Sequence, residues 1–92
     1  MLNPPPTVPP PSDQQIESAL LAFVAERGHS ASACPSEVAR QLRPESWREL
    51  MPSIRRVASE LAKHRRLEIT QRGLKILPNE PFKGPIRIRM AK

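Results

Sequence analysis

The sequence has little that would crosslink the chain or carry it across a membrane. Its 92 residues include one cysteine, Cys34, whereas a secreted domain of this size usually carries several paired cysteines. No apolar run approaches the roughly 20 residues that a transmembrane helix needs. The N-terminus also lacks the basic and apolar regions of a signal peptide. We therefore expect a cytoplasmic protein in a reducing compartment, with no membrane partner.

Aromatic side chains are equally scarce. Phe23, Trp47 and Phe82 are the three in the chain, and there is no tyrosine. Domains that bind single-stranded RNA on a sheet stack bases on several aromatic side chains, so the composition argues against that class. The length of the chain allows one domain but not two. The sequence also offers no convergent set of titratable residues for catalysis, so we predict no enzyme activity and no catalytic residue.

Charge is the informative part of the composition. Fifteen Lys and Arg against nine Asp and Glu give a net charge of +6. Residues 1–46 carry three basic and five acidic residues, a balance of −2, whereas residues 47–92 carry twelve and four, a balance of +8. Such asymmetry concentrates positive potential in one part of a small domain. It favours a polyanionic partner such as nucleic acid.

Proline is concentrated at the N-terminus, where six of the twelve prolines fall within the first eleven residues. Proline removes backbone hydrogen-bond donors and fixes φ, so such a segment forms neither a helix nor a sheet ladder. We predict a disordered tail over residues 1–12 and one folded domain over residues 13–92.

Three helical segments follow the tail. Ser12 and Gln15 have the spacing of a capping box, and Gly28 supplies a stop, so we expect a helix over residues 13–27. Pro35 suits the first position of a short helix over residues 35–42. A third apolar stripe at helical spacing begins at Trp47. Because Pro52 interrupts it, we expect a turn over residues 45–50 and a main helix over residues 52–64.

The periodicity then changes to that of strands. Apolar and polar residues alternate over residues 67–71, and Arg72-Gly73 marks a turn before a partner strand over residues 74–77. A third strand is expected over residues 86–90, and a brief extended segment over residues 29–33. This order of elements predicts an α+β fold, a small winged helix-turn-helix with three helices and a short antiparallel sheet.

The predicted core joins the apolar residues of all these elements. Trp47 is expected to be an anchor, because it lies centrally on the apolar stripe of the third helix. The full predicted core is Ile16, Leu20, Phe23, Val38, Leu42, Trp47, Ile54, Val57, Leu61, Ile69 and Ile88.

Four segments also resemble a known family: CPSEVAR from Cys34, WRELMP from Trp47, ITQRG from Ile69 and GPIR from Gly84. Together they are similar to an uncharacterised bacterial family of small winged-helix domains, over about residues 13–90. The resemblance implies a winged-helix fold and a bacterial, cytoplasmic setting. Because that family is of unknown function, the resemblance implies no activity and no site.

The predicted functional site is a basic surface for duplex DNA. The outer face of the third helix would approach the major groove, and the hairpin and last strand would contact phosphates. The alternative is a solvated basic face that meets an acidic protein partner and binds no nucleic acid. The residues predicted to bind nucleic acid are Ser53, Arg55, Arg56, Lys63, Arg72, Lys75, Arg87 and Arg89.

Cys34 and the two histidines are the other chemically distinctive residues. A thiol at the start of the second helix would have its thiolate stabilised by the helix N-terminus, but a cysteine there can equally be a small packed residue. His29 and His64 are isolated and lack metal-ligand spacing. We predict no metal site and no cofactor, and the oligomeric state stays open.

Overall fold

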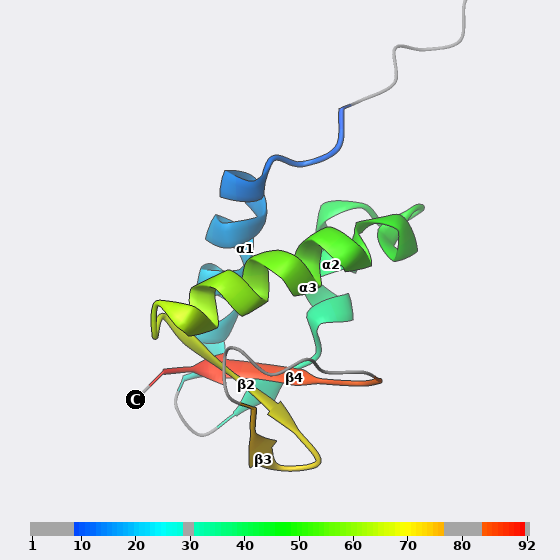
Figure 1. Ribbon diagram of the computed structural model, residues 1–92. Coiled ribbons are helices and arrows are strands. Elements are labelled where there is room, and N and C mark those ends of the chain that lie inside the picture. Colours follow the sequence, from blue (N-terminus) through cyan, green and yellow to red (C-terminus); the bar gives the residue numbers. More distant parts are fainter. Residues whose placement is uncertain (1–8, 29–30, 77–83, 92) are drawn as a thin grey trace, which may run out of the picture.

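A computed structural model describes residues 9–28, 31–76 and 84–91. The chain forms helices α1 (Asp13–Arg27), α2 (Pro35–Leu42) and α3 (Trp47–Lys63). Its strands are β1 (Ser32–Ala33), β2 (Leu67–Gln71), β3 (Leu74–Lys75) and β4 (Arg87–Met90). The helices lie on one side of a small sheet (Figure 1). Three helices and an antiparallel sheet confirm the predicted α+β class.

Both ends of α1 are as the sequence predicts. The Ser12 hydroxyl accepts a hydrogen bond from the Gln15 amide at 3.1 Å, and the Gln15 side chain accepts one from the Ser12 amide at 2.8 Å. This reciprocal pair satisfies two backbone donors that the helix itself leaves unpaired. Gly28 ends the helix at φ 74°, a conformation that glycine adopts without a Cβ clash.

The end of the N-terminal segment contacts the domain. The backbone carbonyl of Pro9 accepts a hydrogen bond from the Arg43 guanidinium, at the end of α2. Residues 1–8 lie outside the described residues, so the predicted disorder of the tail stays a prediction.

The connection between α2 and α3 is shorter than the sequence predicts, because α3 continues through Pro52 as one helix. Only residues 43–46 separate the two helices, which is a usual length for a helix-turn-helix. The predicted break at Pro52 is wrong. Proline inside a helix costs about 3 kcal/mol, but Leu50 before it and Ile54 after it are both buried against one core. Each such burial contributes about 1.5–3 kcal/mol, which offsets the proline.

The sheet has the order β1-β4-β2-β3, with every neighbouring pair antiparallel. Ile69 on β2 faces Ile88 on β4, and Ala33 on β1 also pairs with Ile88. The brief strand before α2 and the strand near the C-terminus are therefore confirmed, but β1 covers only Ser32–Ala33 and β4 begins at Arg87 and not at residue 86. β3 ends at Lys75, before the predicted end at residue 77. Residues 29–30 and 77 of the predicted strands lie outside the described residues.

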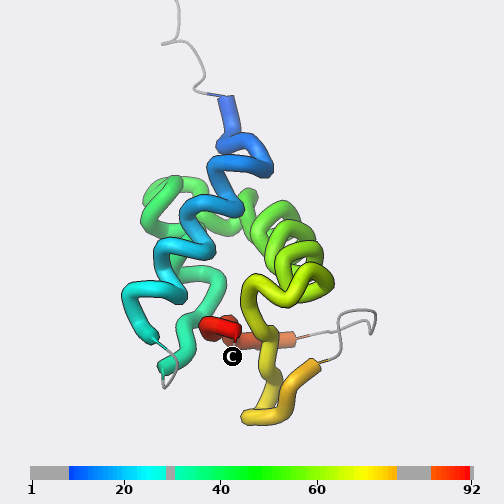
Figure 2. Tube along the Cα trace, turned by 90° about the vertical axis from the view of Figure 1, so that its left-hand side faces the viewer, coloured from blue at the N-terminus to red at the C-terminus, as the bar shows by residue number. Residues whose placement is uncertain are grey.

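Buried apolar residues of the three helices and of the sheet form one core cluster. Figure 2 shows the backbone of the helices beside that of the sheet. Eight residues of the predicted core are buried: Ile16, Leu20, Val38, Ile54, Val57, Leu61, Ile69 and Ile88. Phe23, Leu42 and Trp47 pack against this cluster but are only partly buried. Trp47 is thus at the edge of the core and keeps part of its ring accessible. The whole arrangement is consistent with a winged helix.

Candidate nucleic-acid interface

The residues predicted to bind nucleic acid lie in three places. Ser53, Arg55, Arg56 and Lys63 are on α3, and Lys75, Arg87 and Arg89 are on the sheet. Arg72 is in the turn between β2 and β3. The structure therefore does not bring all eight onto one continuous face.

The exposed arc of α3 has two sides of different charge. Counted at about 100° per residue, one side holds Arg48, Arg55, Ser59 and Lys63, and it contains no acidic residue. The Arg55 guanidinium donates to the Gly84 carbonyl at 2.6 Å, just before β4. We call the β2–β3 turn and residues 84–86 the wing, and this half of α3 the wing side.

The other half of the arc holds Ser53, Arg56, Glu49 and Glu60, and it faces α1. Arg56 donates two hydrogen bonds to the Asp13 carboxylate, at 2.8 and 2.9 Å. These hydrogen bonds, followed by the positive charge of Arg56, lower the pKa of Asp13 below its usual value of 3.8. Arg56 is thus engaged in a fork-to-fork pair that joins α1 to α3.

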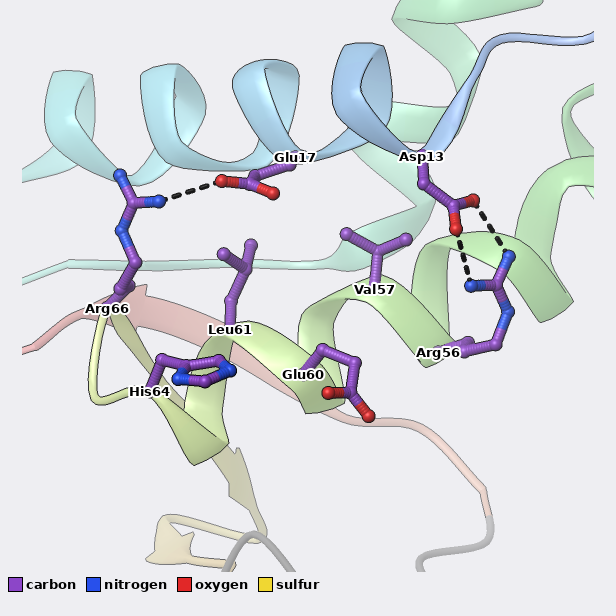
Figure 3. A pocket seen from close by; sticks show the side chains of 8 residues that line it. All are labelled: Asp13, Glu17, Arg56, Val57, Glu60, Leu61, His64 and Arg66. Carbon is purple, nitrogen blue, oxygen red and sulfur yellow. Dashed lines mark hydrogen bonds and ion pairs between the residues drawn. The ribbon is translucent and has the colours of Figure 1, made fainter.

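A groove of about 510 Å³ runs between α1 and this half of α3, which we call the α1 side (Figure 3). Val57 and Leu61 form its apolar floor. A second ion pair crosses it, in which Arg66 lies 2.7 Å from Glu17. Three carboxylates and two guanidinium groups share its lining, a balance of −1, so the groove does not attract a polyanion.

The sheet residues are on the face that points away from the helices. Arg89 donates to Glu68 at 2.8 Å, and Lys75 lies 3.4 Å from the same carboxylate. The hydrogen bond from Arg89 and then that from Lys75 lower the pKa of Glu68 below its usual value of 4.5. Arg87 donates to the hydroxyl and the carbonyl of Ser32, at 2.6 and 2.9 Å. All three predicted basic residues of the sheet therefore have intramolecular acceptors.

Arg72 has a different setting. It has φ 55° and Gly73 has φ 82°, so both residues of this two-residue turn adopt left-handed conformations. Such turns match the twist of a hairpin, but arginine is a poor residue for them because its Cβ crowds the backbone. Arg72 is exposed, and within the described chain its guanidinium has no ion pair. The neighbouring Leu74 is 74% exposed.

One cluster in this region was not predicted from the sequence. The guanidinium carbons of Arg40 on α2 and Arg48 on α3 each lie 4.5 Å from the centre of the Trp47 ring. Arg40 lies on a different helix from Trp47 and Arg48, so no helical periodicity links it to them. A tryptophan with arginines near it in the sequence was the available signal, but the apolar stripe assigned Trp47 to the core.

The comparison with protein families finds a match over most of the chain. Residues 13–91 match the family described as "Protein of unknown function (DUF3253)". The chain belongs to this family. A search of curated proteins finds no match. Membership agrees with the resemblance to a family of unknown function, and the bacterial setting stays a prediction.

Cys34, His64 and His29 are the remaining candidates of this DUF3253 domain. Cys34 is half-buried at the start of α2, with Sγ 3.0 Å from the Ser36 hydroxyl. Its amide donates to Glu37 at 2.8 Å, which together with Arg27 lowers the pKa of Glu37. His64 lines the α1-side groove, and His29 lies outside the described residues.

Two searches of the described residues complete this picture. None of the helices in these parts of the chain combines the length and the apolar character needed to span a membrane. Over the same residues, no three potential His, Cys, Asp or Glu ligands are grouped to hold a metal ion.

Proposed function

We propose that this domain is a binding module for duplex DNA and not an enzyme. The observation that carries the proposal is the charge difference across α3. Its wing side has arginine, lysine and serine without an acidic residue, and the contact between Arg55 and Gly84 joins it to the wing. A helix with this polarity, beside a hairpin that projects a basic residue, suits a major groove flanked by phosphates.

The geometry narrows the set of residues in the proposed interface. Arg55, Lys63 and Arg72 are the phosphate-contacting candidates, and Ser59 lies between the first two on α3. Lys63 has an exposed ion pair with Glu60 at 3.1 Å. Because such surface pairs contribute little, a phosphate can replace the carboxylate. Ser53 and Arg56 lie on the α1 side, and the sheet residues Lys75, Arg87 and Arg89 point away from α3, so they are outside this narrower interface.

A salt titration tests the proposal. A short random-sequence duplex is titrated with the full chain between about 50 and 200 mM salt, and the affinity is plotted against salt on logarithmic axes. Three phosphate contacts at about −0.9 each predict a slope of about −2.7 or steeper. Arg72→Ala is expected to make the slope shallower by about 0.9 and to weaken all sequences equally.

The matched control is Arg66→Ala, which removes the same charge from the α1 side, where Arg66 pairs with Glu17. It should leave the slope unchanged. If the wild-type chain does not bind duplex DNA at low salt, where electrostatic attraction is strongest, the proposal fails. The interaction with an acidic protein partner then becomes the leading hypothesis.

A further inference from the structure

The Arg40–Trp47–Arg48 cluster places two cations on one aromatic ring at the junction of α2 and α3. Both guanidinium carbons are 4.5 Å from the ring centre, within the range of a cation–π contact. Both arginines are exposed, whereas Trp47 packs against the core. The tryptophan thus contacts the core and two like charges.

A comparison within the chain shows what is unusual about this cluster. Arg27 also stacks on a ring, at 4.9 Å from the centre of Phe23, but its guanidinium pairs with Glu37 at 3.0 Å. Among the described residues, neither Arg40 nor Arg48 forms an ion pair. The acidic residues nearest to Arg48 in sequence, Glu45 and Glu49, form none with it either. Two neighbouring cations therefore share a ring without a carboxylate to neutralise them.

Stacking leaves the hydrogen-bonding edge of a guanidinium available. When a guanidinium lies flat over a ring, its five N–H donors lie in the guanidinium plane and stay available to an acceptor. The ring also restricts the rotamers of both side chains, so less conformational entropy is lost when an acceptor arrives. This is a preordered site for a planar or tetrahedral oxyanion, and phosphate fits the fork geometry of arginine.

The position of the cluster connects it to the proposed DNA interface. Arg48, Arg55 and Ser59 lie within about 40° of one another around α3. The cluster is therefore at the N-terminal end of the wing side, where the α3 backbone amides also favour negative charge.

We propose that Arg40 and Arg48, preordered by Trp47, bind phosphate groups, and that in the complex these are backbone phosphates of duplex DNA. The inference rests on the proposed function and deepens it. It assigns Trp47 as a positioning residue and adds two phosphate contacts. The slope expected for the wild-type domain becomes about −4.5, from five contacts at about −0.9 each.

The first test removes the two charges. Arg40→Gln combined with Arg48→Gln is expected to make the slope shallower by about 1.8, to about −2.7. The matched control is Arg27→Gln combined with Arg66→Gln, which also removes two positive charges but takes them from existing ion pairs. The control should keep the wild-type slope. The wild type and the Arg40/Arg48 variant could instead give equal slopes while Arg72→Ala gives a shallower one. That result would overturn phosphate binding by the cluster but leave the DNA proposal standing.

The second test separates positioning from packing. Trp47→Phe keeps a ring face and should retain the wild-type slope and most of the affinity. Trp47→Leu keeps apolar volume without a ring, so affinity should fall about three- to tenfold per ordered arginine while the slope stays unchanged. Circular dichroism checks that each variant folds. Equal affinity of folded Trp47→Phe and Trp47→Leu would show that Trp47 only packs.

The third test identifies the source of the phosphate. Trp47 is the single tryptophan, so its fluorescence reports on the cluster directly. Duplex DNA should change the emission of the wild-type chain but not of the Arg40/Arg48 double variant. If the chain does not bind duplex DNA yet inorganic phosphate changes the emission in an arginine-dependent way, the cluster binds a free phosphate and only the DNA proposal fails. If neither probe changes the emission, the phosphate-binding role of the cluster is overturned, and the salt titration alone decides the DNA proposal.

Discussion

The two sides of α3 carry similar basic residues but have opposite neighbours. On the α1 side, Arg56 meets Asp13, and Arg66 just beyond the helix meets Glu17, so both positive charges are paired across the groove. On the wing side, Arg55 donates to the backbone carbonyl of Gly84, and no acidic residue of α3 lies on that half of the arc, although Lys63 at its edge reaches Glu60. Net charge alone does not define a binding surface. The distribution of acids brought there by the fold decides which side attracts a polyanion.

The largest effect on stability should come from truncating a residue on the buried face of α3, which fixes the position of both sides of this helix. Ile54 is fully buried between α3 and the rest of the core. Ile54→Ala is expected to reduce the free energy of unfolding by about 2–5 kcal/mol, and Ile54→Val by about 0.5–1.5 kcal/mol. Urea denaturation measures both. An unchanged midpoint for Ile54→Ala would contradict the assignment of α3 as one continuous core helix.

The next effect concerns the outer face of the sheet, where two basic side chains pair with one carboxylate that is largely shielded from water. Glu68 has a side chain only 12% exposed and contacts both Arg89 and Lys75. Glu68→Gln is expected to destabilise the domain by about 1–2 kcal/mol at neutral pH. Because its pKa is lower in the folded state, the stabilisation is present above the ordinary pKa of 4.5 and is lost as pH falls. The variant should therefore show a weaker loss of stability on acidification than the wild type.

A substitution in the wing is expected to raise stability and to weaken DNA binding. Arg72→Gly relieves a left-handed arginine at φ 55° and should stabilise the domain by about 0.5–1 kcal/mol. The same change should make the DNA slope shallower by about 0.9.

Arg65→Gly is its matched control, because Arg65 is also exposed and left-handed, at φ 60°. It should stabilise the chain similarly without changing the slope. Thermal unfolding and the salt titration measure the two properties. Loss of stability in both glycine variants would show that neither turn is strained.

The smallest effect is expected on the α1 side. Asp13→Asn removes the carboxylate that accepts from Arg56, but the pair is exposed, with side chains 55% and 63% accessible. Water and salt screen such a pair strongly, so the thermal midpoint should change little. A titration of the same variant with duplex DNA is the more sensitive measurement, because the substitution frees the Arg56 guanidinium from its carboxylate partner. A steeper slope would mean that the α1 side joins the interface once its acid is removed.

Much of the fold could be predicted because its signals are local. The capping box at Ser12, the proline at the start of α2 and the two-residue turn at Arg72 each act within a few residues. The exception was Pro52. Its local preference predicted a break, but burial of apolar residues on both sides of it gave one helix.

The candidate site could be predicted only in part. The sequence identified which residues are basic and which lie on the exposed arc of α3. It did not indicate that Arg89 would meet Glu68, or that Trp47 would hold Arg40 beside Arg48. Arg89 and Glu68 come from different strands, and Arg40 and Trp47 from different helices, so no periodicity relates them.

By itself, then, the sequence determined the elements, their buried faces and the excess of positive charge, because backbone propensity and apolar period are properties of short segments. The tertiary structure decided which positive charges are neutralised. The partners of Arg56 and Arg66 are 43 and 49 residues away in the chain. Coulomb attraction between exposed groups is strong only over a few ångströms in water, so these pairs exist only after the core has brought α1 against α3.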